Sequence, residues 1–115
     1  MGVAKFDCTT ELVTDDWYLL QTQGPESIRV MEAATRSTIT DLKFLYAKWM
    51  SIDGMEFLAL RQGASGERGY ELWGPAKDGQ VVYNAIVTAG KKFGIRELGM
   101  CAKLVNHVRY YAGLI

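Results

Sequence analysis

One stretch decides the fold, and it reads RQGASGERGYELWGP from Arg61 to Pro75. Glycine permits positive φ and close backbone approach, so the first half predicts a tight, irregular loop. The loop glycines are Gly63, Gly66 and Gly69. The second half, from Tyr70 to Trp73, reads as a strand that stops at a Gly-Pro pair. Strand alternation places Tyr70 and Leu72 on one face and Glu71 and Trp73 on the other.

The carboxylate of Glu71 is the first candidate functional group. An ionised carboxylate only accepts hydrogen bonds, so beside aromatic rings it suits a flat heterocycle with adjacent N–H donors. Trp73 or Tyr70 would supply the aromatic wall. The alternative is a solvated strand carboxylate with no ligand, and spacing alone does not separate the two.

Length and composition indicate one globular domain. The chain has 115 residues, of which 49% are hydrophobic and 23% are charged. Lysine plus arginine equals aspartate plus glutamate at 13 each, so no net field attracts nucleic acid or an anionic membrane. No long apolar run or leader is visible, so we expect a cytoplasmic protein. Cys8 and Cys101 are expected to be free thiols, and the single histidine, His107, excludes a histidine-rich metal site.

Hydrophobic periodicity and turn residues divide the chain into alternating helices and strands. We expect strands at 17–21, 44–52, 55–60 and 70–73, a short strand at 95–97, and helices at 25–35, 76–93 and from 98 to about 112. Asp53-Gly54 predicts a two-residue hairpin, and Gly94 predicts the end of a helix. The predicted fold is α+β: a two-layer sandwich in which helices cover one face of a mostly antiparallel sheet.

Other polar groups carry weaker hypotheses. The glycine loop lacks the Lys-Ser/Thr of a phosphate-binding loop and joins two strands, so a hairpin loop is favoured over a phosphate cradle. Asp15-Asp16 could be an acid–base pair, although a solvated loop is favoured. His107 could be a general base, but it shares its predicted helix with Lys103, Asn106 and Arg109, and a solvated helix face is favoured.

At these residues the chain resembles a known family. Residues 61–72 match the glycine cleavage T-protein (aminomethyltransferase) signature R-T-G-Y-T-G-E-D-G-Y-E-L without a gap. Residues 17–27 resemble the A-L-x-x-Q-G-P junction of that family, and residues 76–94 resemble its next helix and glycine. Ala64-Ser65 and the Trp73-Gly74-Pro75 ending look more like the branch of tetrahydrofolate-dependent demethylases that act on vanillate or syringate. The resemblance covers residues 16–99.

This resemblance implies a folate-binding fold that accepts a one-carbon unit on tetrahydrofolate. The glutamate of Gly-Tyr-Glu binds the pterin ring in the family, and here that position is Glu71. Tyr70 and Arg61, from the same motif, are the other expected cofactor-binding residues. No catalytic residue is assigned. The upstream aspartate segment and the C-terminal barrel of the family are expected to be absent, so residues 1–115 form a single domain from the folate-binding region.

The chain also departs from the next family motif, which reads roughly G-A-R-D-x-L-R-L-E-A-G. Cys101 stands at its arginine position, and a tyrosine of the demethylase branch falls near Lys103. We therefore expect a tetrahydrofolate-binding segment of a methyl or aminomethyl transferase that is inactive alone. A partner chain or a homo-oligomer would supply the missing parts. The alternative is a non-catalytic binding or assembly module that retains the fold.

Overall fold

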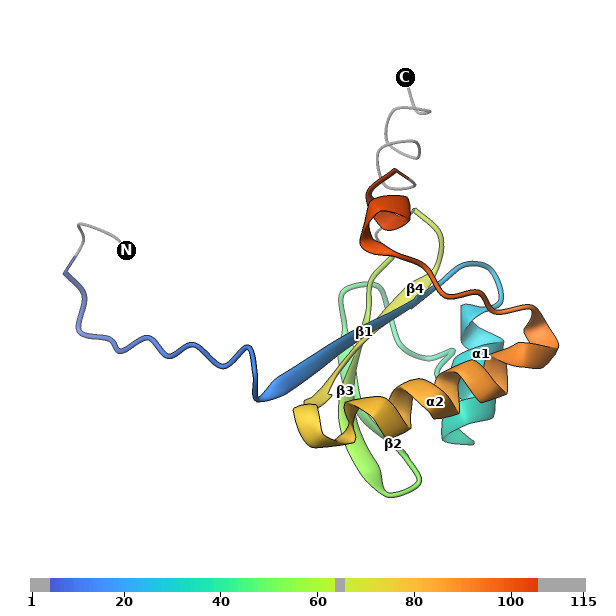
Figure 1. The fold of residues 1–115 in the computed structure, drawn as a ribbon, viewed down its shortest axis with the longest axis horizontal. Coiled ribbons are helices and arrows are strands. Elements are labelled where there is room, and N and C mark those ends of the chain that lie inside the picture. The colour runs from blue at the N-terminus through green and yellow to red at the C-terminus, as the bar shows by residue number, and fades with distance from the viewer. Residues whose placement is uncertain (1–4, 64–65, 106–115) are drawn as a thin grey trace.

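Four antiparallel strands form one layer of the structure, and two helices form the other (Figure 1). The computed structural model describes residues 5–63 and 66–105. The strands are β1 (Trp17–Gln23), β2 (Ala47–Ile52), β3 (Met55–Arg61) and β4 (Gly69–Pro75), in the spatial order β1-β4-β3-β2. The helices are α1 (Ser27–Thr35) and α2 (Gly79–Gly90). They contact each other, and α1 packs on β2 and β4 while α2 packs on β1. The predicted α+β sandwich is confirmed.

The hydrophobic core lies entirely between the sheet and the helices. Alternate residues of β2, β3 and β4 point into it, and apolar residues of the helices and of the α1–β2 connection complete it. Its buried members are Val30, Met31, Ile39, Leu42, Met50, Ile52, Phe57, Ala59, Tyr70, Leu72, Val82 and Ile86. Burial of one face of the sheet therefore supplies most of the apolar stabilisation of the domain.

Neither α1 nor α2 covers the opposite face of the sheet, although the polar side-chain atoms of Gln21 at one end of this face are shielded from solvent. Strand register aligns Leu19 with Trp73, Trp73 with Leu58, and Leu58 with Trp49, which makes an apolar row across all four strands. Trp17, Trp49 and Trp73 are exposed by 45%, 64% and 39%. We call these residues, Trp17, Leu19, Trp49, Leu58 and Trp73, the open face.

The hairpin between β2 and β3 follows the sequence prediction. Asp53 has φ 50° and Gly54 has φ 82°, so both turn residues are left-handed. This is the requirement of a two-residue turn whose twist matches that of the flanking strands. The predicted helix stop is also confirmed, because Gly94 has φ 74° after a short 3-10 turn, Lys91–Phe93.

Three element starts differ from the sequence prediction. The helix α2 begins at Gly79 and not at Ala76, because Ala76–Asp78 form a short 3-10 turn before it. The first helix begins at Ser27 and not at Pro25, because the turn that leaves β1 at Gly24 (φ 112°) includes both Pro25 and Glu26. The second strand begins at Ala47 and not at Phe44, because Leu45 has φ 63° and bends the chain.

The predicted short strand at 95–97 is wrong. Ile95 donates its N–H to the carbonyl of Gly90 (3.1 Å), and its side chain packs where Gly90 has no Cβ. These contacts fold the segment back onto the end of α2. Residues 100–105 are helical as expected. The remainder of that predicted helix, including Asn106, His107 and Arg109, lies outside the described residues.

Residues 5–16 extend away from the body of the protein before β1 (Figure 1). All of them are exposed, including the apolar side chains of Phe6 and Leu12. Among the described residues, no helix combines the length and the apolar composition that a membrane crossing requires.

Tyr18 fills the corner where β4 leads into α2. A Cβ at Gly74 would lie 2.7 Å from its ring, and a Cβ at Gly79 would lie 3.1 Å from its Cβ, so the ring occupies the space that these two glycines leave. Its hydroxyl is buried and has no hydrogen-bond partner among the described residues. Burial, with a smaller contribution from the charge of Asp78, raises the pKa of Tyr18 to about 12.

The one-sided core predicts unequal effects of truncation on the two faces of one hairpin. Phe57 is fully buried, whereas Trp49 on the neighbouring strand is on the open face. We expect Phe57→Ala to lower the free energy of unfolding by about 3–5 kcal/mol. Trp49→Ala should cost less than about 1 kcal/mol because little of its surface leaves water on folding. Urea unfolding followed by circular dichroism measures both, and equal losses would contradict a one-sided core.

Tyr18 predicts a loss of stability at alkaline pH. Its pKa is higher in the folded protein than in the unfolded chain, so the unfolded state gives up this proton first as pH rises. Stability due to the neutral phenol is complete below about pH 10 and declines towards about pH 12. Tyr18→Phe should leave stability at pH 7 nearly unchanged and reduce the decline in this window. Melting temperatures of both proteins measured across pH 8–12 test this, and parallel declines would refute it.

Candidate functional site

A small hydrogen-bond network ties the glycine loop to the turn between β1 and α1. The carbonyl of Arg68 accepts hydrogen bonds from the N–H of Gly24 (2.8 Å) and from the hydroxyl of Ser27 (3.0 Å). Ser27 is buried, so its hydroxyl stabilises this contact away from water. Two segments about 40 positions apart in the sequence thus meet at the end of β1 and β4.

The glycines of the loop are required by space and by backbone conformation. A Cβ at Gly69 would lie 2.8 Å from the carbonyl oxygen of Thr22 and 3.0 Å from that of Gln62. A Cβ at Gly63 would overlap the carbonyl oxygen of Glu67. Gly66 has φ 80°, in the left-handed region that favours glycine. The predicted tight, irregular loop is confirmed, and Ala64-Ser65 lie outside the described residues.

Glu71 lies in the middle of β4, an inner strand of the sheet. It is opposite Gln21 on β1 and Leu60 on β3, on the side away from the helices. Its side chain is half-buried. Neighbouring strands fix its backbone on both sides, so the carboxylate projects from a rigid base, beside the open-face residue Trp73.

Tyr70 and Arg61 lie on the other side of the sheet. Tyr70 is only 1% exposed and belongs to the core, where burial raises the pKa of its phenol. Arg61 is its partner in the β3–β4 register and donates from Nη1 to the carbonyl of Leu42 (2.8 Å). Both side chains therefore lie on the helix side of the sheet, opposite the face that carries the Glu71 carboxylate. The structure does not bring the three predicted cofactor-binding residues together on one face.

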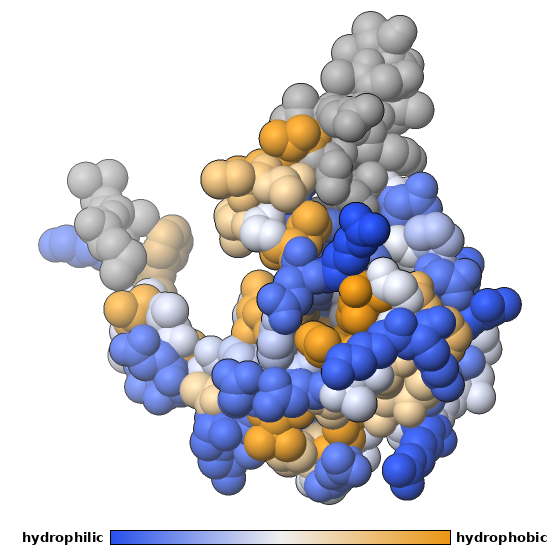
Figure 2. Space-filling model, turned by 45° about the vertical axis from the view of Figure 1, so that its right-hand side comes forward, coloured by the Kyte–Doolittle hydropathy of each residue, from blue (hydrophilic) through white to orange (hydrophobic). Residues whose placement is uncertain are grey.

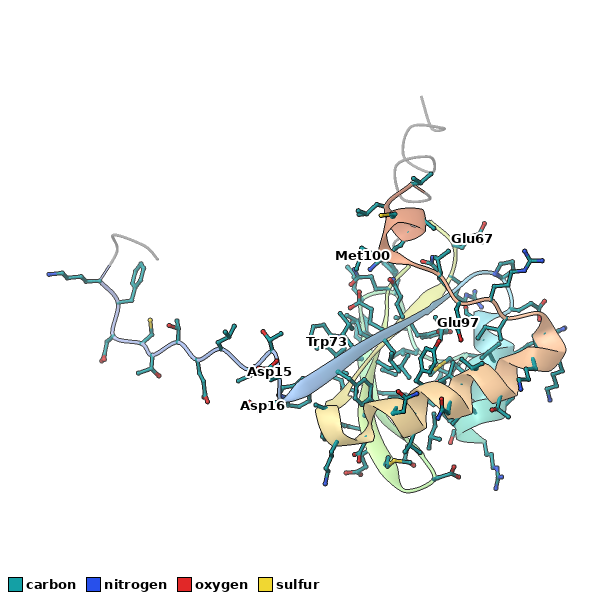
Figure 3. All side chains as sticks on the ribbon, in the orientation of Figure 1. Asp15, Asp16, Glu67, Trp73, Glu97 and Met100 are labelled. Carbon is teal, nitrogen blue, oxygen red and sulfur yellow. The ribbon has the colours of Figure 1, made fainter. Side chains whose placement is uncertain are left out.

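A groove of about 1370 Å³ runs along the outer edge of β1. Leu19, Gln21 and Gln23 line it from the sheet, and Met100 and Lys103 line it from the C-terminal segment. Glu67 borders the groove from the glycine loop, and Figure 3 shows Glu67, Glu97 and Met100 at the same end of the molecule. Figure 2 shows apolar side chains between this segment and the body, bordered by hydrophilic ones. Glu71 lies one strand inward from the groove, next to Gln21.

The C-terminal wall of the groove is attached to α2. The nearby carboxylate of Glu97 raises the pKa of Tyr83, which lies on α2. Within this C-terminal segment, the backbone carbonyl of Gly99 accepts a hydrogen bond from the N–H of Lys103 (3.1 Å). In residues 5–63 and 66–105, no group of three His, Cys, Asp or Glu side chains is placed to hold a metal ion.

The other predicted candidates lie away from Glu71 or cannot be placed. Asp15 and Asp16 are at the start of β1, at the opposite end of that strand from Glu67 (Figure 3). The backbone carbonyl of Asp16 accepts a hydrogen bond from the N–H of Ala76 (2.9 Å), near the corner that Tyr18 fills. Cys8 and Cys101 are free and exposed. His107 is outside the described residues.

The family model described as the GCVT N-terminal domain matches residues 2–114 of the chain. The chain belongs to this family. The family prediction made from the Gly-Tyr-Glu motif is confirmed.

Named relatives agree with the family and with the predicted branch. Syringate O-demethylase of Sphingobium sp. is 40% identical over 82 residues, which cover 71% of this chain and 18% of that protein. An aminomethyltransferase of Caldanaerobacter subterraneus is 32% identical over 114 residues, covering 98% of this chain and 29% of that protein. Sesamin methylene transferase of Sinomonas sp. is 36% identical over 90 residues, which cover 78% of this chain and 20% of that protein. The chain therefore spans less than a third of the length of these relatives, which place it in a family of one-carbon transferases.

The close backbone approach at Gly69 predicts a large effect of one methyl group. Gly69→Ala should lower the free energy of unfolding by about 1–3 kcal/mol, because both neighbouring oxygens belong to the backbone and cannot move aside. Gly99→Ala is the matched control, since a Cβ there meets nothing within 4 Å. Its effect should stay within about 0.5 kcal/mol. Chemical denaturation measures the free energy of unfolding of both variants. A Gly69→Ala protein as stable as the Gly99→Ala control would contradict the close packing at Gly69.

Proposed function

We propose that this chain binds tetrahydrofolate through Glu71 and forms the folate-binding segment of a one-carbon (methyl or aminomethyl) transferase, in the cytoplasm. The observation that carries the proposal is the position of Glu71. It is a half-buried carboxylate, fixed on an inner strand, and it faces the side of the sheet that the helices leave uncovered. Tetrahydrofolate would supply the nitrogen atoms that accept the one-carbon unit.

The residues around Glu71 fit the chemistry of a pterin. One edge of the pterin presents a ring N–H and an amino group side by side, and a carboxylate can accept both hydrogen bonds. Trp73, two residues along on the same face, offers an apolar wall for a flat ring. Because β1 and β3 both pair with β4, this carboxylate needs little ordering when a ligand binds.

Tyr70 and Arg61 enter the proposal as positioning residues. Tyr70 anchors β4 in the core, and Arg61 ties the end of β3 to the carbonyl of Leu42. Each fixes the strand on which Glu71 stands or the strand next to it. Their effect on folate binding is proposed to pass through the backbone, because their side chains lie on the helix side of the sheet.

We further propose that the chain does not turn over a substrate alone. Transfer of a one-carbon unit needs a group that positions the donor and one that protonates its leaving group. Asp15 and Asp16 lie at the other end of β1 from the loop that precedes Glu71, so they are not offered for either role. A partner chain or a second copy would supply these groups. The exposed tryptophans of the open face favour the alternative, a non-catalytic assembly module.

Exchange of one carboxylate tests the folate anchor. Glu71→Gln should weaken tetrahydrofolate binding at least about tenfold, because the amide loses the charge and turns an N–H towards donors of the ligand. Glu56→Gln is the control: Glu56 lies on β3, faces the same side of the sheet and is exposed. Isothermal titration calorimetry under anaerobic, reducing conditions measures all three proteins.

Each outcome has a separate meaning. Binding by wild type and Glu56→Gln but not by Glu71→Gln supports the folate anchor. No binding by wild type would favour the assembly module. Demethylation or aminomethyl transfer by the isolated chain, with tetrahydrofolate as acceptor, would overturn the proposal that it is inactive alone.

A further inference from the structure

The outer side of β1 is an open strand edge. Just before the strand, the carbonyl of Asp16 accepts the N–H of Ala76, and just after it, the N–H of Gly24 donates to the other side of β4. Hydrogen-bonded residues alternate along an antiparallel strand, so the even-numbered residues of β1 bond to β4. The odd-numbered residues turn their N–H and C=O groups outwards, where no described strand pairs with them; they are Trp17, Leu19, Gln21 and Gln23. Such a row of backbone groups is a template for a further strand.

The side chains of β1 also indicate a further neighbour. Within residues 5–63 and 66–105, the buried side-chain nitrogen and oxygen atoms that lack a hydrogen-bond partner all belong to this strand. Their residues are Tyr18, Gln21, Thr22 and Gln23. Native domains contain few such atoms, and here they are concentrated on the strand at one edge of the sheet. The environment of β1 in a single chain is therefore less complete than that of the other strands.

The open edge borders the groove described above, which has a volume of about 1370 Å³. Sites for small molecules usually have volumes of roughly 300–1,000 Å³, so this groove has room for a length of polypeptide. Its apolar lining from α2 and the segment after α2 comprises Tyr83, Ile86, Val87, Phe93 and Ile95. An extended segment seated here would bond to β1 through its backbone and would cover this apolar surface with its side chains.

The segment before β1 has the properties of such a strand. We call residues 5–16 the arm; it is exposed throughout and runs away from the body of the protein (Figure 1). Between Phe6 and Leu12, uncharged residues alternate with residues that include Asp7 and Glu11, which is the period of a strand. These seven residues equal β1 in length. A strand gains little stability without a sheet, so this pattern indicates that the arm pairs with an edge elsewhere.

Charge favours the arm as the occupant of the groove. The arm carries one lysine and four carboxylates, which gives it a net charge of −3. Residues 91–103, which border the groove, carry four lysine or arginine residues and one glutamate, which gives a net charge of +3. Opposite charges on two surfaces speed their encounter and select against wrong partners.

We propose that the arm of one copy of this chain adds to the outer edge of β1 in a second copy, and that the two copies exchange arms. The arm continues outwards from its own β1, and the bond between Asp16 and Ala76 fixes the chain at the point where the arm leaves. Reciprocal exchange gives a closed pair with two-fold symmetry, in which neither β1 edge stays open. The exchange uses the edge of β1 and not the carboxylate of Glu71, so it is independent of folate binding.

Sedimentation velocity over a series of concentrations tests the exchange in the full chain. We expect wild type to sediment as two chains. Thr9→Pro combined with Thr10→Pro removes two successive N–H groups of the arm, one of which the new ladder needs in either register. This double variant should associate at least about tenfold more weakly. Thr9→Val with Thr10→Val is the matched control, because it keeps both N–H groups and the preference for a strand.

Both double variants leave the body of the protein intact, because Thr9 and Thr10 are exposed. Hydrogen exchange followed by nuclear magnetic resonance then locates the contact. The outward amides of Leu19 and Gln23 should exchange at least about tenfold more slowly in wild type than in the proline variant, because the partner's arm bonds to this edge. The amide of Leu20 bonds to β4 and should exchange slowly in both proteins.

Three results would overturn the proposal. If wild type is a single chain at every concentration, no exchange occurs, and slow outward amides in that single chain would show that its own arm folds back onto β1. If the proline variant associates as wild type does, the copies meet through another surface, such as the open face. If the outward amides stay slow in the proline variant, a different segment covers the edge of β1. Loss of association in the proline variant alone, with loss of amide protection, supports the exchange of arms.

Discussion

The carbonyl oxygen of Arg68 accepts two hydrogen bonds, and these fix how β1 lies against β4. Its donors, the N–H of Gly24 and the hydroxyl of Ser27, belong to the turn after β1, so the end of that strand is held to the start of β4. Gly69 allows the two backbones to approach at this point. The register that follows places Gln21 opposite Glu71. A shift of one residue would turn Gln21 to the core side, and this contact helps the β1–β4 ladder to prevent such a shift.

The helices cover only one face of the sheet, so the adjacent residues Tyr70 and Glu71 of the Gly-Tyr-Glu motif lie in different environments. Adjacent strand residues point to opposite faces, so Tyr70 enters the core while Glu71 leaves it. The buried tyrosine makes the strand rigid, and the rigid strand holds the carboxylate in place. Residues that are neighbours in a motif thus lie on different sides of the sheet: Tyr70 packs in the core, and Glu71 stands on the face where we propose that the ligand binds.

Local chemistry made much of the fold predictable. The Asp53-Gly54 turn, the helix stop at Gly94 and the glycine loop follow from backbone preferences that the sequence displays. The strand at 95–97 failed because Ile95 had a tertiary contact available at Gly90 that no local pattern reveals. The pairing of Gln21 with Glu71 could not be predicted for a similar reason, because it depends on the register of two strands that lie far apart in the sequence.

The open face has one more consequence, for spectroscopy. All three tryptophans of the chain lie on it, and none belongs to the core. Their emission in the folded protein should resemble that of the unfolded chain, since water already reaches the indole rings. Tryptophan fluorescence would then follow unfolding poorly, but a shift to shorter wavelength would signal that something has covered this side of the sheet.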